Sequence, residues 1–215
     1  MRKIDKGETP IGWRERQSTP NAQYERIEEL ANALIEEQGY LCAYCMRRID
    51  VEHTRIEHVH CQSGHSQEVL DYNNMVICCD GDILGHNNEK EFHCDRKKGE
   101  RNISFSPTDE FFIDTISYGS KDGEIKSSNE QYDKEMNEVL NLNLPILKRN
   151  RFEVLRGVIN VLGDRNGKVW KKSDLQRMLR MYMEKKNYGT YSGYREYSGI
   201  VIWYLKKKLA RLGIN

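Results

Sequence analysis

Hydrophobic positions follow a helical period near both ends of the chain. Ala31 and Leu34 belong to an apolar face that repeats every three or four residues over 19–38, so we expect a helix there. Residues 1–18 are polar and carry few such signals, which predicts an extended arm. From residue 129 onward the helical spacing returns, and it predicts helices over 133–140, 146–162, 173–186 and 198–212.

Between these helical parts, short runs of branched and apolar residues indicate strands. Residues 55–59 and 75–79 have this character. Residues 111–126 have the pattern of a hairpin around a Gly/Asp/Lys turn. Together with the helices, these segments predict an α+β fold.

The chemistry-bearing residues divide the chain further. All six cysteines and all six histidines lie within 41–101, which we therefore expect to form a metal-binding core. The predicted organisation is an N-terminal arm and helix (1–40), this core (41–101), a connecting hairpin (102–128) and a mainly helical, basic region (129–215).

Composition narrows the class of protein. The chain has 215 residues, and no apolar run approaches the roughly 18 residues that a membrane-spanning helix needs. Residues 1–7 lack the apolar centre of a signal peptide. We therefore expect a cytoplasmic protein with no membrane partner, whose cysteines bind metal or stay free rather than form disulfides.

The net charge of +1 is unevenly distributed along the chain. Residues 141–215 contain 17 basic and 5 acidic residues, a net charge of +12 that the acidic segments before them offset. Tyrosines and tryptophans, among them Trp203, are interleaved with these basic residues. Such a surface suits either nucleic acid, through phosphate neutralisation and base stacking, or an acidic partner protein, and the sequence does not separate the two.

The cysteine spacing predicts a zinc site. Cys42 and Cys45 form a C-x2-C knuckle, which supplies two of the four tetrahedral ligands that zinc prefers. We predict that Cys42, Cys45, Cys79 and Cys94 bind a structural zinc ion, which would add folding free energy to a region with few apolar residues. Cys78 is expected to be a core thiol, because adjacent strand residues point to opposite faces.

Several alternatives for the cysteines stay open. The long segment between Cys79 and Cys94 leaves open the choice between Cys78 and Cys79. His86 or His93 can also substitute for a cysteine as a ligand. The cysteines can instead be buried free thiols, or Cys42 and Cys45 a redox pair, although no βαβ pattern surrounds them.

A second candidate site lies where the first predicted strand ends, at Glu57 and His58. A carboxylate can hold a hard divalent cation, and an imidazole with a pKa near neutrality can take a proton from water. Cleavage of a phosphodiester bond needs an activated nucleophile and a cation that stabilises the leaving oxygen. The pair therefore indicates metal-assisted hydrolysis.

In their order along the chain, these residues resemble the zinc-knuckle form of the HNH nuclease family. The matching string covers residues 42–99 and consists of Cys42-x2-Cys45, Glu57-His58-Val59, 74–79 and 94–99. The resemblance implies a ββα-metal core, stapled by the four-cysteine zinc site, and an endonuclease that depends on Mg²⁺ or Mn²⁺.

The resemblance also implies a role for each matching residue. His58 matches the general base, Glu57 and Asp95 the ligands of the catalytic divalent ion, and Asn74 the residue that braces the loop and orients the base. Asp95 stands where the family usually has histidine or asparagine, and it keeps an oxygen ligand suited to magnesium or manganese. Cys61 stands where many members have proline.

Other residues near these positions have two interpretations each. Asn73 is the alternative to Asn74. His60 and His65 are either ligands of substrate or metal, or solvated loop residues. Residues 97–99 either contact phosphate or simply end the short helix with basic residues and glycine.

A narrower resemblance extends over the whole chain. Residues 1–4, 55–58, 79–81 and 105–109 are similar to the HNH nucleases of Septu anti-phage systems and of some retrons. This implies an effector nuclease of antiviral defence that acts with an ABC- or SMC-like partner ATPase, and in a retron beside a reverse transcriptase and its nucleic acid. DNA is the favoured substrate and RNA the alternative.

Two other classes of protein compete with the nuclease. One is a non-catalytic zinc ribbon that binds nucleic acid or protein through the basic helices. The other is a thiol redox protein. The combination of Glu57, His58 and Asn74 favours the nuclease, because a bare ribbon requires none of them.

Overall fold

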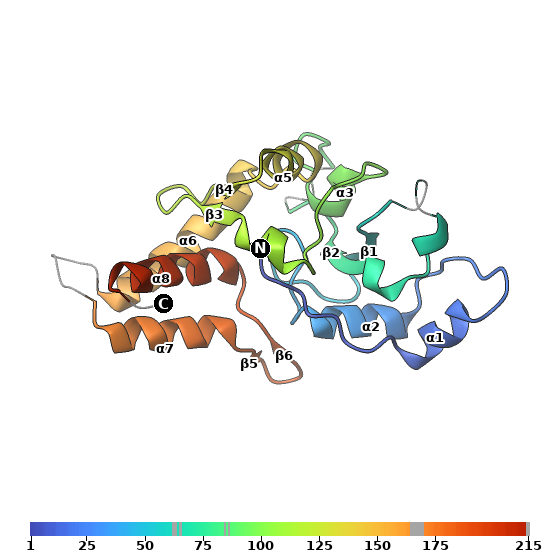
Figure 1. The fold of residues 1–215 in the computed structure, drawn as a ribbon, viewed down its shortest axis with the longest axis horizontal. Coiled ribbons are helices and arrows are strands. Elements are labelled where there is room, and N and C mark those ends of the chain that lie inside the picture. Colours follow the sequence, from blue (N-terminus) through green and yellow to red (C-terminus); the bar gives the residue numbers. More distant parts are fainter. Residues whose placement is uncertain (62–63, 65, 84, 86, 164–169, 214–215) are drawn as a thin grey trace.

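The fold is known from a computed structural model that describes residues 1–213 except 62–63, 65, 84, 86 and 164–169. His65 and His86 therefore lie outside the described residues. The described chain is a mixed α+β protein in which helices surround small two-stranded antiparallel sheets (Figure 1). None of its described helices combines the length and the apolar character needed to cross a bilayer.

Both strands predicted in the metal-binding core are present. β1 (Thr54–His58) pairs antiparallel with β2 (Met75–Cys79), so that His58 lies opposite Met75. Short 3-10 turns, η1 (Ser66–Glu68) and η2 (Tyr72–Asn74), lie in the connection between them. All five residues of β2 are buried, because α2 (Glu28–Glu37) and α3 (Cys94–Lys98) both pack against it. A strand that is buried on both faces has apolar residues at every position, which explains the continuous apolar run in the sequence.

The prediction for the N-terminal forty residues was wrong in two respects. Residues 1–18 are not a plain extended arm, since they contain α1 (Ile11–Gln17). Its Trp13 is completely buried and donates a hydrogen bond from Nε1 to the Leu70 carbonyl oxygen at 3.0 Å. The second helix begins only at Glu28, because the backbone turns at Asn21, where φ is +59°, and Ile27 reaches the core from extended backbone.

The predicted hairpin at 111–126 is present but shorter. Its first residues form a helical turn, α4 (Glu110–Asp114), because the Asp109 side chain accepts a hydrogen bond from the Phe111 amide and so caps a helix. The strands that remain are β3 (Ile116–Tyr118) and β4 (Ile125–Ser127).

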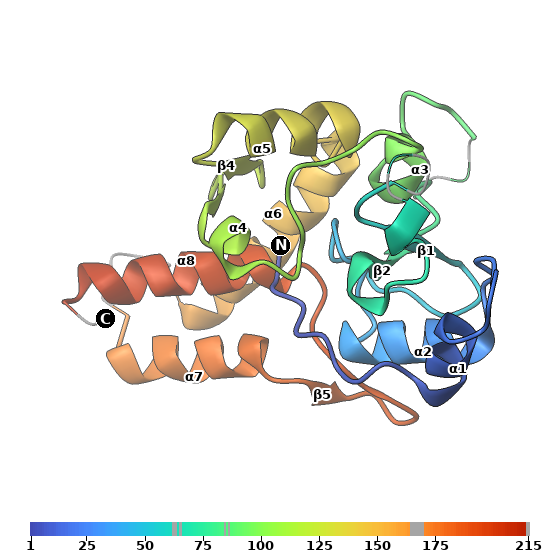
Figure 2. The same cartoon turned by 45° about the vertical axis from the view of Figure 1, so that its right-hand side comes forward.

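The C-terminal region is mainly helical, as predicted. Its elements in order are α5 (Glu130–Lys134), the π-helical turn η3 (Glu135–Val139), α6 (Pro145–Leu162), α7 (Lys172–Met183), the small hairpin β5 (Lys186–Asn187) and β6 (Ser192–Gly193), and α8 (Ser198–Arg211). α7 ends three residues before its predicted end and runs alongside α8 (Figure 2).

α8 begins beside the cysteine knuckle and leads away from it. Its first turn lies beside the cysteine knuckle, where the Tyr197 amide donates to the Met46 carbonyl oxygen at 3.0 Å. From there α8 runs away from β1 and β2, as both ribbon views show (Figures 1 and 2). The last turn of α8 therefore lies far from β1, the strand that carries Glu57 and His58.

Candidate active site and metal centre

Four cysteine side chains converge from three separate elements. Cys42 and Cys45 come from the loop after α2, Cys79 from the end of β2 and Cys94 from the start of α3. The Ala43 amide donates to the Ile77 carbonyl oxygen at 3.1 Å, which fixes the knuckle to β2. The structure thus brings together the set that the spacing predicted.

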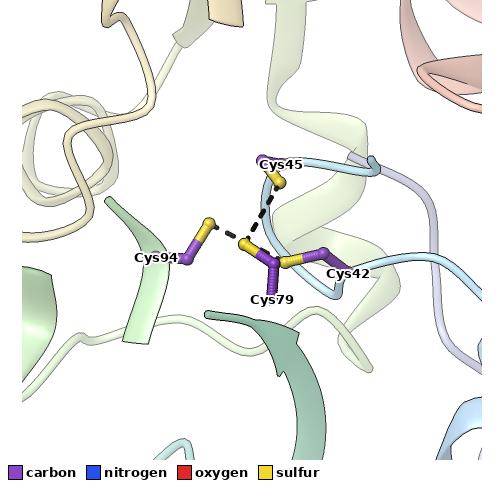
Figure 3. Close-up of side chains that lie close together, drawn as sticks. All are labelled: Cys42, Cys45, Cys79 and Cys94. Atoms are coloured by element: carbon purple, nitrogen blue, oxygen red, sulfur yellow. Dashed lines mark hydrogen bonds between the residues drawn. The ribbon is translucent and has the colours of Figure 1, made fainter. Parts of the chain in front are cut away.

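The geometry of this group fits a tetrahedral metal ion (Figure 3). Its sulfur atoms all lie within 4.8 Å of one another, with 3.7 Å between Cys42 and Cys94 and 3.8 Å between Cys45 and Cys79. Zinc–sulfur bonds of about 2.3 Å in a tetrahedron place the sulfurs about 3.8 Å apart. The group contains Cys79, whereas the buried Cys78 is not one of the four.

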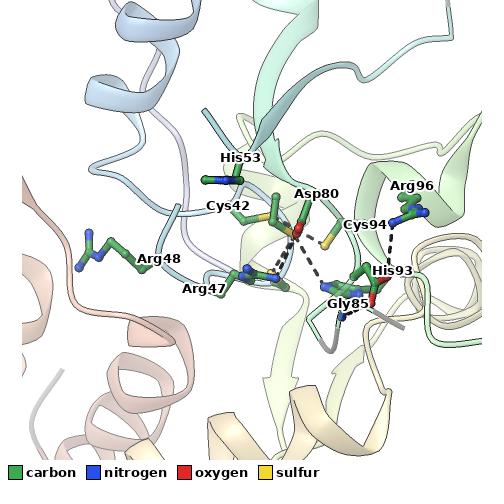
Figure 4. Close-up of polar contacts among 12 residues, drawn as sticks. Cys42, Arg47, Arg48, His53, Asp80, Gly85, His93, Cys94 and Arg96 are labelled. Atoms are coloured by element: carbon green, nitrogen blue, oxygen red, sulfur yellow. Dashed lines mark hydrogen bonds and ion pairs between the residues drawn. The ribbon is translucent and has the colours of Figure 1, made fainter. Parts of the chain in front are cut away.

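Charged and polar groups surround the four sulfurs (Figure 4). Arg47 pairs with Asp80 at 3.2 Å, and the buried His93 places Nε2 3.7 Å from the Cys79 sulfur. Burial lowers the pKa of Arg47, but the electrostatic effect of the neighbouring Cys79 and Cys45 sulfurs outweighs it and raises this pKa. A zinc ion with four thiolates carries a net charge of −2, so a guanidinium beside it is the expected counter-charge.

A cavity of about 210 Å³ lies beside α3 and contains the second candidate site. Residues from β1, from the loop after it and from α3 line this cavity, and we call it the cleft: Ile56, Glu57, His58, Cys61, Asp95, Lys98, Gly99 and Glu100. The cleft therefore brings together three of the residues that the resemblance assigned to the nuclease site.

Glu57 is held by two buried partners. The Lys98 ammonium lies 2.8 Å from Oε1 of Glu57, and the Tyr44 hydroxyl donates to the same oxygen at 3.1 Å. Lys98 also donates to the His58 carbonyl oxygen at 3.0 Å. Lys98 thereby fixes both the acid and the backbone of its neighbour.

Asp95 contacts Glu57 across the cleft. Burial and the nearby Asp95 carboxyl raise the pKa of Glu57 well above its ordinary value, while Lys98 acts in the opposite direction. Arg55 lies 3.9 Å from Asp95. Two adjacent carboxylates supply the oxygen ligands that Mg²⁺ and Mn²⁺ prefer, and Mg²⁺ commonly binds through one or two carboxylates and several waters. The residues present therefore fit such an ion.

The His58 ring has a defined orientation. Its Nε2 lies 2.9 Å from the Val69 carbonyl oxygen, and its ring packs edge-on against Tyr24 with 4.8 Å between centroids. Because a carbonyl oxygen only accepts, Nε2 is the protonated nitrogen and Nδ1 carries the lone pair of the neutral ring. Burial lowers the pKa of His58, which favours this neutral form.

Asn74 is buried and braces the loop after His58. Its Oδ1 accepts from the His60 amide at 2.8 Å, and its Nδ2 donates to the carbonyl oxygens of His60 and Glu68 at 3.1 and 3.3 Å. It thus fixes the chain on both sides of the His58 ring. Asn73 is exposed, and both its amide and its side chain donate to the neighbouring Asp71.

Two successive residues of α3 connect the metal centre with the cleft. Cys94 points to the sulfur cluster and Asp95 to Glu57. Since Cys94 is completely buried, a metal ion at the sulfurs fixes the first turn of α3 and with it the position of Asp95.

Sequence reasoning missed two residues of the site, Tyr44 and Lys98. Lys98 is the last residue of α3 before Gly99, as one of its two interpretations predicted, but its side chain is 1% exposed and pairs with Glu57, which neither interpretation included. A signal was present, because Lys98 follows Asp95 by three residues and shares its helix face. His60 lies at the surface and pairs with Glu68 at 2.6 Å.

Comparison with known proteins gives a partial match. The chain is 26% identical over 134 residues to a Vibrio cholerae (serotype O1 biovar El Tor) protein described as "Retron Vc95 putative HNH endonuclease". The match covers 58% of this chain and 62% of that protein, so the chain spans less than two thirds of its relative. No family model matches the chain. The similarity supports the class of HNH endonucleases and no narrower group.

Proposed function

We propose that the chain is a metal-dependent HNH endonuclease that hydrolyses phosphodiester bonds in nucleic acid, with β1, β2 and α3 as its ββα-metal core. The observation that carries this proposal is the cleft itself. It contains the contacting carboxyls of Glu57 and Asp95 beside the oriented imidazole of His58. The similarity to a protein described as an HNH endonuclease agrees with it.

Each residue has a distinct role in the proposed reaction. His58 takes a proton from water at Nδ1, while Val69 fixes the ring through Nε2. Asn74 maintains the loop that carries this contact. Glu57 and Asp95 would hold the divalent cation, which would supply Lewis-acid stabilisation of the charge on the scissile phosphate. Lys98 and Tyr44 keep one oxygen of Glu57 in place.

The four cysteines have a structural role in this proposal. A zinc ion bound by Cys42, Cys45, Cys79 and Cys94 stabilises the knuckle, β2 and α3 as one unit. By resemblance, we further propose that the chain serves in anti-phage defence with an ATPase partner, in a retron beside a reverse transcriptase, and that DNA is its preferred substrate over RNA.

The experiment is a cleavage panel of single- and double-stranded DNA and of RNA, with Mg²⁺ or Mn²⁺, for the chain alone and with its ATPase partner. We expect cleavage by the wild type, loss of cleavage in Glu57→Gln and Asp95→Asn, and unchanged zinc content in both variants. A non-catalytic zinc ribbon predicts the opposite, namely nucleic-acid binding that neither substitution changes and no cleavage with either metal.

A further inference from the structure

A second, basic cavity lies at the far end of α8. It has a volume of about 130 Å³, and we call it the basic hollow. Residues of the β3–β4 turn and of α8 from its middle onward line it: Ser120, Trp203, Tyr204, Lys207, Lys208 and Arg211. We propose that the basic hollow binds a phosphate group of the nucleic-acid backbone and so positions the polymer at a distance from the cleft.

The charge of the basic hollow is uncompensated. Three of its six lining residues are cations and none is acidic. Lys207, Lys208 and Arg211 form no ion pair with any residue that the structure describes. Asp122, two residues beyond Ser120, is paired with Lys148 at 3.4 Å. The three cations are therefore available to an anion from outside.

Aromatic rings contact two of these cations, Lys207 and Lys208, and the rings of Trp203 and Tyr204 line the basic hollow. The Lys207 ammonium lies 4.7 Å from the Trp203 ring centroid, and the Lys208 ammonium lies 4.7 Å from Trp170 and 5.2 Å from Tyr204. Cations ordered in this way lose less side-chain entropy when they bind a phosphate. The aromatic wall adds a surface on which a base can stack, which favours nucleic acid over an acidic peptide.

Stabilisation of the helix does not account for all of these residues. Basic residues in the last turn of a helix interact favourably with its dipole, and this applies to Lys208 and Arg211. It does not apply to Lys207, nor to Lys206, which lines an adjoining groove with Trp203. The helix dipole also does not explain why Ser120 of the β3–β4 turn lines the same hollow.

The distance of the basic hollow from the cysteine knuckle suits a polymeric ligand. α8 starts beside the cysteine knuckle and has 14 residues, which gives it a length of about 21 Å. A nucleic-acid strand has a phosphate every ~3.4 Å, so a strand that contacts the basic hollow can extend over this distance towards the other end of α8. Binding at the basic hollow does not depend on the proposed cleavage, but its effect on cleavage does.

The test compares two triple variants of the full chain. The first, Lys207→Gln/Lys208→Gln/Arg211→Gln, removes the cations of the basic hollow. The matched control, Lys148→Gln/Arg156→Gln/Arg177→Gln, removes the same charge from residues that already have acidic partners. Binding of labelled DNA and RNA strands of about 30 nucleotides is measured between about 50 and 200 mM salt.

A plot of log affinity against log salt has a negative slope. We expect the first variant to make this slope less steep by about 2–3, and the control by less than about 1. We also expect slower cleavage of long strands, with hydrolysis of bis(4-nitrophenyl) phosphate unchanged, because that small diester cannot reach the basic hollow. Equal losses in the two variants, or unchanged nucleic-acid binding with lost binding of poly-glutamate, would overturn the proposal. A chain that binds as expected but cleaves neither substrate would contradict the proposed nuclease and leave this inference standing.

Discussion

The Lys98 ammonium lies 2.8 Å from Oε1 of Glu57, and the two side chains are only 1% and 4% exposed. A buried ion pair of this kind costs desolvation free energy, so its presence calls for an explanation other than stability. Its position supplies one, since it fixes the carboxylate that we assign to the catalytic cation. Glu57 can then bind that cation through its other oxygen.

Replacement of Lys98 should destabilise the fold, because it leaves the buried Glu57 without its partner. We expect Lys98→Met to lower the free energy of unfolding by about 3–5 kcal/mol, because it leaves a buried carboxylate without its counter-charge. Chemical denaturation of the zinc-loaded chain measures the change. In the double variant Lys98→Met/Glu57→Gln, the loss should be smaller than the sum of the two single losses. Strict additivity would contradict the coupling.

The cysteine cluster gives a prediction with a matched control on the adjacent residue. Cys79→Ser should lose the zinc and lower the melting temperature sharply, because a ligand is removed. Cys78→Ser should retain one zinc per chain and lose only about 1–3 kcal/mol, the cost of a buried hydroxyl. Elemental analysis and thermal melting distinguish them. Retention of zinc by Cys79→Ser together with its loss from Cys78→Ser would reverse the assignment.

Asn74 should act on the reaction rather than on the metal centre. Its side chain fixes both ends of the loop after His58, so Asn74→Ala should reduce kcat by about 10²-fold through misplacement of the base. The zinc content should not change. Asn73→Ala is the control, because Asn73 is exposed, and it should retain nearly the wild-type rate. Similar rates in the two variants would remove Asn74 from the site.

The pH dependence follows from the surroundings of His58. Burial lowers its pKa below the ordinary value of about 6.5, so the ring remains neutral and able to accept a proton at a more acidic pH than a free histidine. The rate should fall as the pH drops through the lowered pKa, which places the acidic midpoint of the His58 limb below about 6.5. A His58-dependent limb above that value in a kcat/KM profile would contradict this account.

Local patterns were informative where short segments decide the structure. The apolar run at 75–79 predicted β2, and the C-x2-C spacing predicted a cysteine cluster, because a strand period and a knuckle span only a few residues. The end of α2 near residue 38 was also predicted. The structure gives the reason for a glycine directly after it, because Gly39 adopts φ +61° and a side chain there would collide with Tyr194.

The remaining features depend on contacts between distant segments, which spacing does not show. The segment around Trp13 forms helix α1 where an extended arm was predicted. The Trp13 indole is buried and donates a hydrogen bond to the Leu70 carbonyl oxygen. The pairing of Lys98 with Glu57 was not predicted, because Glu57 and Tyr44 lie far from Lys98 along the chain and only the fold brings the three together. Tertiary packing decides both cases.

The most direct test of the central claim is hydrolysis of bis(4-nitrophenyl) phosphate with Mn²⁺ by the wild-type chain and by His58→Ala, both loaded with zinc to the same content. This diester needs no partner protein for its delivery to the cleft. If His58 is the general base, the wild type should hydrolyse it and the variant should be slower by about 10²–10⁴-fold. A His58→Ala chain that hydrolyses the diester at the wild-type rate would contradict the account.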